Sequence, residues 1–208
     1  MKKRLIDIDK SREILIPEIL NENECKIGAE IGVFKGEFSN YLLNNWDGKL
    51  FLIDPWRPLG DEYDDISNHK HHLDTYQKTI ENIKGFENRS FMMRGLSEEL
   101  SFVFQDNFLD FVYIDGNHAY DFVKKDINLW WNKIKHGGFL MGHDYLNLDW
   151  YENLKFASNG KDKYIYGLNG EYRGIFGVNP AVDEFCEKHN LDGYQTNDWY
   201  GSFIIEKI

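Results

Sequence analysis

Short apolar runs alternate with amphipathic stretches along most of this 208-residue chain, and this alternation restricts the possible folds more than any other feature. The run FLDFVYI at 108–114 is nearly all apolar, as expected of a strand buried on both faces of a sheet. The stretch that follows it carries Ile127, Trp130 and Ile134 at helical spacing. Strands that alternate with helices in this way predict an α/β fold, in which a mostly parallel sheet has helices on both faces.

The alternation predicts a single domain of residues 1–208 with seven strands, and we expect them to form a Rossmann-like, mostly parallel sheet whose last strand is antiparallel. Residues 1–25 are expected to form a helical extension, with Pro17 bending or splitting its helix. The segments 56–74 and 146–171 lack clear periodicity, so we expect variable insertions on the substrate side there, the first of them a lid. The expected strands are 26–31, 49–53, 90–93, 108–114, 139–142, 172–178 and 202–206, with the last two paired, and the expected helices are 11–21, 37–44, 75–83, 123–135 and 180–189.

The composition restricts the partners of the chain. Its formal net charge of −11 argues against a protein that grips the nucleic-acid backbone, because phosphate binding draws on clustered Lys and Arg. No run approaches the ~18 apolar residues of a membrane span, and no apolar stretch follows the basic start to form a secretory signal. Cys25 and Cys186 lack metal-binding spacing, so free thiols are expected rather than a disulfide. These features predict a cytoplasmic protein without nucleic-acid or membrane partners.

The loop after the first expected strand, EIGVFKG from residue 30, has the spacing of a nucleotide-binding turn with one departure. The GxGxxG fingerprint of dinucleotide sites needs a glycine where Phe34 stands, so that the backbone can approach a pyrophosphate. The spacing ExGxxxG instead suits a cofactor with an amino-acid tail, whose carboxylate lies near the helix N-terminus and whose ammonium is drawn to an acid. The loop therefore disfavours a nicotinamide oxidoreductase.

Asp54 ends the second expected strand, which lies beside this loop in a parallel sheet. A carboxylate at that place accepts hydrogen bonds from ribose hydroxyls, which nucleoside cofactors share. Each signal also has a plainer interpretation, since the glycines could serve only a tight turn and Asp54 could cap a helix. Together and in this order, they favour a nucleoside cofactor bound where the strand order reverses.

Polar residues also follow the fourth and fifth expected strands. The fourth ends in YIDGNHAY, which places Asp115 and His118 at its carboxyl end, and the fifth ends in GHDY, with His143 and Asp144. With EIGVFKGEFS, these motifs resemble the class I S-adenosylmethionine-dependent methyltransferases, and within them the small single-domain group with an EIGVxxGxFS first motif and a YIDGxHxY fourth motif. The resemblance extends from about residue 26 to the C-terminus.

The resemblance implies S-adenosylmethionine as the cofactor. Its methionine end would lie on the loop after the first strand, its ribose at the end of the second strand, and its adenine edge after the third strand. The implied cofactor residues are Glu30, Gly32 and Gly36 at the methionine end, Asp54 at the ribose, Ser97 at the adenine edge, and Asp115.

The resemblance also implies the catalytic residues. His118 corresponds to the general base, with Asp115 as the second catalytic residue. Some relatives that share IDG(S/D)xxY are metal-dependent O-methyltransferases of sugars, and Asp115 and Asp144 correspond to their metal ligands. His143 stands where those relatives tend to have a second acid. Magnesium prefers oxygen ligands, whereas imidazole suits manganese, iron or zinc, so the residues leave open whether a metal such as Mg²⁺ or Mn²⁺ binds and whether His143 is a ligand.

The predicted function is O-methylation of a hydroxyl on a small molecule or glycan, with a sugar-like acceptor favoured and a homo-oligomer as a possible assembly. Two alternatives stay open: a metal-independent methyltransferase of another small molecule, and a cofactor-binding partner protein without activity. A nucleic-acid methyltransferase is disfavoured, because IDGNH stands where an NPPY-type base-flipping motif would follow the fourth strand.

Overall fold

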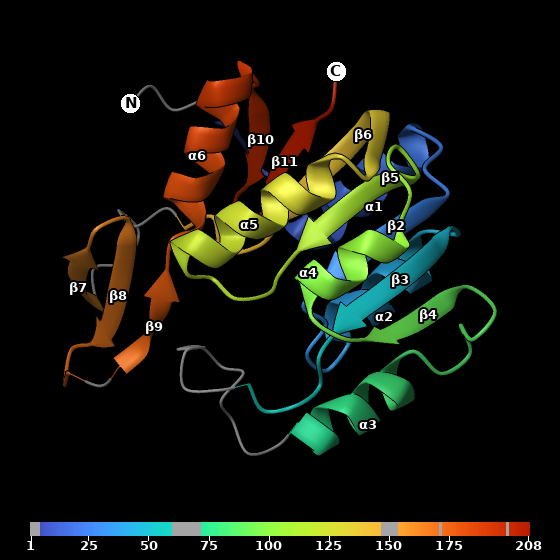
Figure 1. The fold of residues 1–208 in the computed structure, drawn as a ribbon, viewed down its shortest axis with the longest axis horizontal. Helices are drawn as coiled ribbons and strands as arrows, with labels where there is room; N and C mark the ends of the chain where they lie inside the picture. Colours follow the sequence, from blue (N-terminus) through green and yellow to red (C-terminus); the bar gives the residue numbers. More distant parts are fainter. Residues whose placement is uncertain (1–4, 60–71, 147–153, 171, 199) are drawn as a thin grey trace.

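The computed structural model describes residues 5–59, 72–146, 154–170, 172–198 and 200–208. Its main feature is an eight-stranded sheet in the order β1-β10-β11-β6-β5-β2-β3-β4 (Figure 1). Neighbouring strands run parallel except β11, which is antiparallel to β10 and β6. The strands are β1 (Leu5–Ile8), β2 (Ile27–Ile31), β3 (Lys49–Asp54), β4 (Ser90–Arg94), β5 (Leu109–Ile114), β6 (Ile134–Gly142), β10 (Gly193–Thr196) and β11 (Phe203–Glu206).

Helices cover both faces of this sheet, and each face has its own core. The alternation along β5 shows the division, because Val112 and Ile114 pack on one side and Phe111 and Tyr113 on the other. The first side is covered by α5 and α6 and the second by α1 and α2 (Figure 1). The expected Rossmann-like α/β fold is confirmed. The helices are α1 (Arg12–Glu22), α2 (Glu37–Asn45), α3 (His72–Asn82), α4 (Ser97–Leu100), α5 (Tyr120–Trp131) and α6 (Val178–His189), with a short 3-10 helix, η2 (Ser101–Val103).

The sheet has eight strands rather than the expected seven, and two of its members were not predicted. β1 lies within the expected helical extension and pairs in parallel with β10. β10, and not the expected strand 172–178, is the partner of β11. Both strands have four residues, and β10 buries the polar side chains of Gln195 and Thr196. Such short strands lack the apolar alternation by which strands are found in a sequence.

Residues 172–178 instead contribute to a second, three-stranded antiparallel sheet of β7 (Leu154–Asn159), β8 (Asp162–Gly167) and β9 (Tyr172–Phe176). The expected irregular insertion 146–171 is therefore mainly a hairpin of β7 and β8, whose described side chains, apart from the buried Ile165, are exposed or partly exposed. This small sheet lies beside the N-terminal end of α5 (Figure 1). Asp162 accepts a hydrogen bond from the Tyr120 backbone N–H at 2.7 Å, which ties the sheet to the first turn of α5.

The prediction of a lid at 56–74 is wrong for Trp56, and most of the remaining segment lies outside the described residues. Trp56 is 1% exposed and belongs to the core, and its indole N–H donates to the Phe34 carbonyl at 3.0 Å.

Pro17 lies inside α1 without ending it, since the helix continues to Glu22. Cys25 and Cys186 are both buried, and neither forms a disulfide within the described residues, as expected. No described helix has the length and apolar character needed to cross a membrane.

Candidate active site

The carboxyl ends of β2, β3, β4 and β5 open onto one pocket of about 320 Å³. Strand order reverses between β2 and β5, which is the place where open α/β sheets bind their ligands. The pocket is lined by Gly32, Asp54, Gly95 and Asp115, each of which follows or ends one of these strands. The topology therefore gathers at one edge of the sheet the residues that the sequence motifs singled out.

Gly32 and Gly36 are required by the backbone of the loop. Gly32 has a φ of +85°, and a Cβ there would lie 2.1 Å from the Asp115 carbonyl oxygen. Gly36 has a φ of +73° and caps the N-terminus of α2. Only glycine adopts these conformations without strain, and the close approach at Gly32 brings the loop after β2 against the loop after β5.

Asp54 holds the glycine loop from the neighbouring strand. Its Oδ2 accepts hydrogen bonds from the backbone N–H groups of Val33 and Phe34, both at 3.0 Å. Its Oδ1 accepts one from the Trp56 N–H at 2.7 Å. Each carboxylate oxygen can accept more than one hydrogen bond, so a ribose hydroxyl can be added without breaking this arrangement.

Glu30 lies at the buried floor of the pocket, 2% exposed. Burial raises the pKa of its carboxyl to about 8, although the Ser39 hydroxyl, which donates to it at 2.5 Å, acts in the opposite direction. The negative charge of Asp115 also favours the protonated form. A carboxyl in this state is ready to ionise when a cationic group approaches it.

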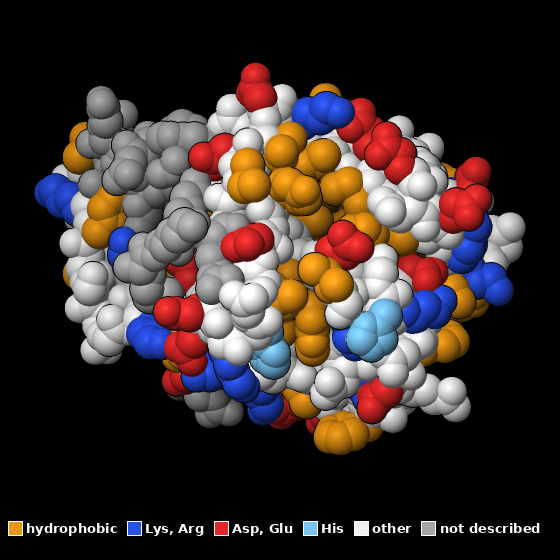
Figure 2. Space-filling view, turned by 90° about the horizontal axis from the view of Figure 1, so that it is seen from above, with side chains coloured by type: hydrophobic (Ala, Val, Ile, Leu, Met, Phe, Trp, Pro, Cys, Tyr) orange, Lys and Arg blue, Asp and Glu red, His pale blue; other side chains and the backbone are white. Residues whose placement is uncertain are grey.

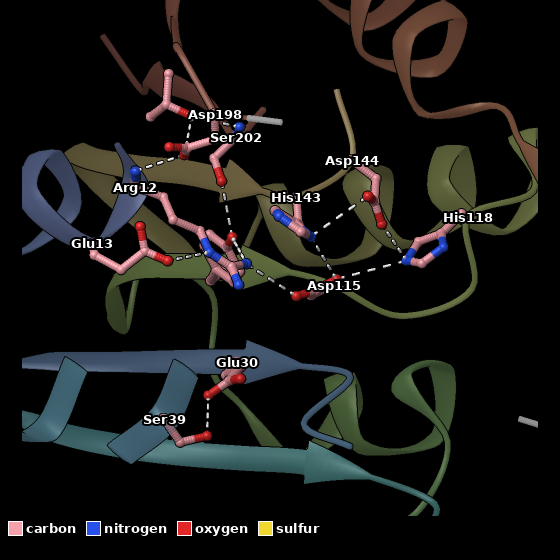
Figure 3. A network of polar contacts seen from close by, with 12 residues as sticks. Arg12, Glu13, Glu30, Ser39, Asp115, His118, His143, Asp144, Asp198 and Ser202 are labelled. Carbon is pink, nitrogen blue, oxygen red and sulfur yellow. Dashed lines mark hydrogen bonds and ion pairs between the residues drawn. The ribbon is translucent and has the colours of Figure 1, made fainter. Parts of the chain in front are cut away.

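Four side chains form a compact polar cluster after β5 and β6 (Figure 3). His118 Nε2 lies 2.9 Å from Asp144 Oδ2 and 3.6 Å from Asp115 Oδ1. His143 Nδ1 lies 3.5 Å from Asp115 Oδ1 and 3.6 Å from Asp144 Oδ1. Asp144 has a φ of +56°, which turns its carboxylate toward the histidines as the chain leaves β6.

Charge pairing dominates this cluster. Burial disfavours the charged form of His143, but its contacts with Asp115 and Asp144 outweigh burial and raise its pKa to about 9. The two histidines in turn hold the pKa values of Asp115 and Asp144 below their usual range, against the effect of burial. The structure thus brings together the four residues that the sequence placed at the ends of two different strands.

Arg12 is a pocket residue that the sequence motifs did not indicate. Its Nη1 donates to the Tyr113 hydroxyl at 3.0 Å and lies 3.6 Å from Asp115 Oδ2 (Figure 3). Its guanidinium lies over the Phe38 ring, 4.8 Å from the ring centre. Asp198 accepts a hydrogen bond from the Arg12 backbone N–H at 2.7 Å and so fixes the start of α1. No local pattern reveals such a residue, because the fold must first bring α1 back to the sheet edge.

Ser97 lines the pocket at the first turn of α4, and Asp126 of α5 lies beside it. The Ser97 hydroxyl donates to Asp126 Oδ1 at 2.5 Å and accepts from the Trp130 indole N–H at 2.8 Å. Asp126 was not singled out in the sequence, although one signal was present. It shares the buried face of α5 with Val123, Ile127 and Trp130, where an acid is unexpected.

Six of the residues expected at the site line this pocket, while Gly36, His143 and Asp144 lie around it without lining it. His143 and Asp144 belong to the polar cluster, and Gly36 supports the loop. The six lining residues are Glu30, Gly32, Asp54, Ser97, Asp115 and His118.

A family model described as a methyltransferase domain (Methyltransf_24) matches residues 29–145, more than half of the chain. The chain belongs to this methyltransferase family. The matched segment runs from β2 to the residue after Asp144 and so contains the glycine loop, Asp54 and the polar cluster. Arg12 and the small sheet lie outside it.

The uncharacterised protein R132 of Acanthamoeba polyphaga mimivirus is 27% identical over 135 residues, or 63% of this chain and 57% of that protein. The chain thus spans a little more than half the length of that relative. A Staphylococcus aureus structure provisionally named a caffeoyl-CoA O-methyltransferase has a TM-score of 0.64 at 16% identity, covering 97% of this chain and 86% of its own. TomG, an O-methyltransferase of Streptomyces achromogenes involved in tomaymycin synthesis and solved with SAM, has a TM-score of 0.63 at 12% identity, covering 94% and 79%. At such identities the likeness establishes the fold.

Proposed function

We propose that this protein is an S-adenosylmethionine-dependent O-methyltransferase that acts on a hydroxyl of a small molecule, with sugar-like acceptors as the first class to test. One observation carries the proposal: a single pocket connects the glycine loop and Asp54 with the cluster of Asp115 and His118. Transfer of a group from a bound nucleoside with an amino-acid tail to a hydroxyl requires that the cofactor site and the catalytic residues share one pocket. Family membership and the S-adenosylmethionine bound to TomG support the choice of cofactor.

The acceptor is proposed to be a small molecule and not a nucleic acid because of the charge on the protein. The net charge is −11. On the face shown in Figure 2, the described acidic and basic side chains lie interspersed around an apolar centre, without one continuous basic surface. A nucleic acid would need such a surface to neutralise its phosphates.

In the proposed complex the ribose hydroxyls bind Asp54 and the methionine end lies on the loop from Gly32 to Gly36. Its ammonium is placed near Asp115, which is ionised, and near Glu30, which would ionise as the ammonium approaches. Its carboxylate is assigned to Arg12, because this cation borders the same part of the pocket and the partial positive charge of the α2 N-terminus lies nearby. The N-terminal segment would then complete a cofactor site whose other residues come from the family domain.

Arg12→Gln is expected to weaken binding of S-adenosylhomocysteine by about ten- to a hundredfold, the loss of a charge-assisted hydrogen bond. Binding of 5′-methylthioadenosine should stay unchanged, because this nucleoside lacks the amino-acid tail. Calorimetric titration of both ligands makes the comparison, with Lys10→Gln as the control for an exposed cation near the same helix. Equal losses of affinity for both ligands would mean that Arg12 stabilises the fold of the pocket and does not bind the cofactor carboxylate.

Methyl transfer requires that the acceptor oxygen attack the methyl carbon as the carbon–sulfur bond breaks and its electron pair returns to sulfur. The products are the methyl ether, S-adenosylhomocysteine and one proton, which needs an acceptor. His118 is proposed to take this proton, since an imidazole suits proton transfer near neutral pH and its ring lines the pocket. Placement of the hydroxyl beside the methyl group supplies much of the remaining rate.

Asp144 is proposed to orient His118. We assign a proton to His118 Nε2, because two unprotonated acceptors would repel one another at 2.9 Å. Nδ1 is then the basic nitrogen of the neutral ring, and the carboxylate stabilises the imidazolium that forms after proton uptake. A carboxylate that holds a histidine in one tautomer has the same role in catalytic triads.

A metal-assisted reaction is the second candidate, because Asp115, His118 and Asp144 each offer a ligand atom within 4.8 Å of the others. Carboxylate oxygens with an imidazole nitrogen fit Mn²⁺ or Zn²⁺, and His143 borders the same carboxylates. A bound cation would acidify the acceptor hydroxyl. It would also use His118 Nε2, the atom to which a proton is assigned in the first arrangement, so His118 cannot hold the cation through this atom and keep that proton.

Chelation separates the two arrangements. Under the proposal, dialysis against EDTA should leave the rate of methyl transfer unchanged, because the proton goes to His118 and the cluster charges already balance one another. The rate is measured with radiolabelled S-adenosylmethionine, before and after addition of Mg²⁺ or Mn²⁺. Loss of activity with EDTA and recovery with Mn²⁺ would establish Asp115, His118 and Asp144 as metal ligands instead.

A further inference from the structure

The ring of Phe176, the last residue of β9, lies nearly parallel to the ring of His118. Their centres are 5.4 Å apart and their planes differ by 12°. We propose that Phe176 is a positioning residue, which fixes the plane of the His118 imidazole and so directs its basic nitrogen toward the acceptor hydroxyl. The proposal rests on the proposed function, since it needs His118 as the base. It gives the small sheet, which lies outside the family domain, a part in the reaction.

The carboxylate contacts of His118 do not by themselves set the plane of its ring. Both are made by Nε2, at 2.9 Å from Asp144 Oδ2 and 3.6 Å from Asp115 Oδ1 (Figure 3). This atom lies at the far end of the ring from Cβ and close to the axis of the Cβ–Cγ bond. Rotation about that bond therefore moves Nε2 little, whereas it turns the ring plane and Nδ1. The torsion about this bond has only broad minima in histidine, so the ring turns at little cost.

A stacked aromatic ring opposes this rotation. The distance of 5.4 Å falls within the range of about 4.5–7 Å that is typical of aromatic pairs. Because the two planes are nearly parallel, rotation of the imidazole would press one of its edges against the Phe176 ring and separate the other edge from it. The contact is made by the face of the imidazole, so it occupies neither nitrogen. Nδ1 and Nε2 stay available for the acceptor and for Asp144.

The backbone fixes Phe176 relative to the loop that carries His118. The N–H of Gly177 donates to the His118 carbonyl at 2.6 Å. A Cβ on Gly177 would lie 2.3 Å from the Tyr120 nitrogen, so any other residue would force these two segments apart. Asp162 of β8 accepts a hydrogen bond from the same Tyr120 N–H at 2.7 Å. The small sheet is thus attached to the chain at His118 and two residues after it.

A small apolar cluster supports the Phe176 side chain. Phe176 packs against Leu146 and Ile165, each 3% exposed. Asn179 holds Leu146 by two hydrogen bonds, since its Oδ1 accepts from the Leu146 N–H at 2.9 Å and its Nδ2 donates to the Leu146 carbonyl at 2.8 Å. This cluster also defines the rival role, in which Phe176 only stabilises the small sheet by packing.

Phe176→Leu separates the two roles, because leucine keeps an apolar side chain in the cluster but has no flat face. The turnover number should fall by about ten- to a hundredfold, as expected when a base leaves its productive geometry. KM for S-adenosylmethionine and affinity for S-adenosylhomocysteine should stay unchanged. Phe176→Tyr keeps the ring and should restore turnover. Phe156→Leu, the same substitution at a 38% exposed ring of β7, is the control and should have no effect.

A second readout does not depend on activity. In the wild type, the ring current of Phe176 should shift the imidazole C–H signals of His118 in the NMR spectrum. These signals are assigned by their absence from the spectrum of His118→Ala. The shift should be lost in Phe176→Leu and kept in Phe176→Tyr.

Each outcome decides the inference. Wild-type turnover in Phe176→Leu, or equal losses in Phe176→Leu and Phe176→Tyr, would overturn it, because the flat face would then have no effect on the reaction. Identical His118 signals in Phe176→Leu and the wild type would also overturn it, because the two rings would not stack in solution. Unchanged turnover in His118→Ala would refute the proposed base instead. An inactive His118→Ala beside a fully active Phe176→Leu would refute only the role of Phe176.

Discussion

Replacement of His118 by alanine is expected to lower the turnover number by about two to four orders of magnitude, the usual contribution of a general acid–base residue. Affinity for S-adenosylhomocysteine should change little, because Glu30 and Asp54 are retained. The backbone carbonyl of residue 118, which accepts from the Gly177 N–H at 2.6 Å, also remains in this variant. The measurement is the single-turnover rate of methyl transfer, together with calorimetric titration of the product nucleoside.

His136→Ala is the matched control, because His136 is an exposed histidine outside the pocket. Loss of the His118 ring also removes its stacking on Phe176, at 5.4 Å between ring centres, so thermal melting should accompany the kinetics. Partial recovery of the rate with added imidazole would support proton transfer over a packing role. Unchanged turnover on a true acceptor would show that His118 is not the base.

Asp54→Ala should produce the opposite phenotype, with affinity for S-adenosylhomocysteine lowered by at least about a hundredfold. The variant loses the ribose hydrogen bonds and the acceptor of three backbone N–H groups, at Val33, Phe34 and Trp56. Binding of 5′-methylthioadenosine should fall in parallel, since it has the same ribose, and this distinguishes the variant from Arg12→Gln. Titration of both nucleosides measures the effect.

The control for Asp54→Ala is Asp47→Ala, which removes an exposed acid just before the same strand. Asp54→Asn should lie between the wild type and the alanine variant, because an amide keeps one of the two acceptor oxygens. Retention of full affinity in Asp54→Ala would show that Asp54 does not bind the ribose, and it would contradict the proposed orientation of the cofactor.

The parallel centre of the sheet could be predicted from the sequence because its strands are apolar on both faces. The run from Phe108 to Ile114 is the clearest example, and the polar residues after such runs must meet at one edge. Asp54, Asp115 and His118 were therefore placed correctly around one pocket by position in the chain alone.

The margins of the fold could not be predicted in the same way. β10 is held by its neighbours β1 and β11, not by apolar alternation within its four residues. β7 and β8 were mistaken for part of an irregular insertion because most of their described side chains are exposed or partly exposed, whereas β9 was expected as a strand but in the main sheet. Arg12 and Asp126 escaped notice because their contacts depend on neighbours distant in the chain, Tyr113 and Asp115 for the first and Ser97 for the second.

The most direct test of the account is calorimetric titration of the wild-type protein with S-adenosylhomocysteine and, separately, with NAD⁺. We predict saturable binding of one S-adenosylhomocysteine per chain and none of NAD⁺, since Phe34 stands where a pyrophosphate would need a glycine. Binding of NAD⁺ without S-adenosylhomocysteine, or of neither, would contradict the proposed cofactor and the reaction that depends on it.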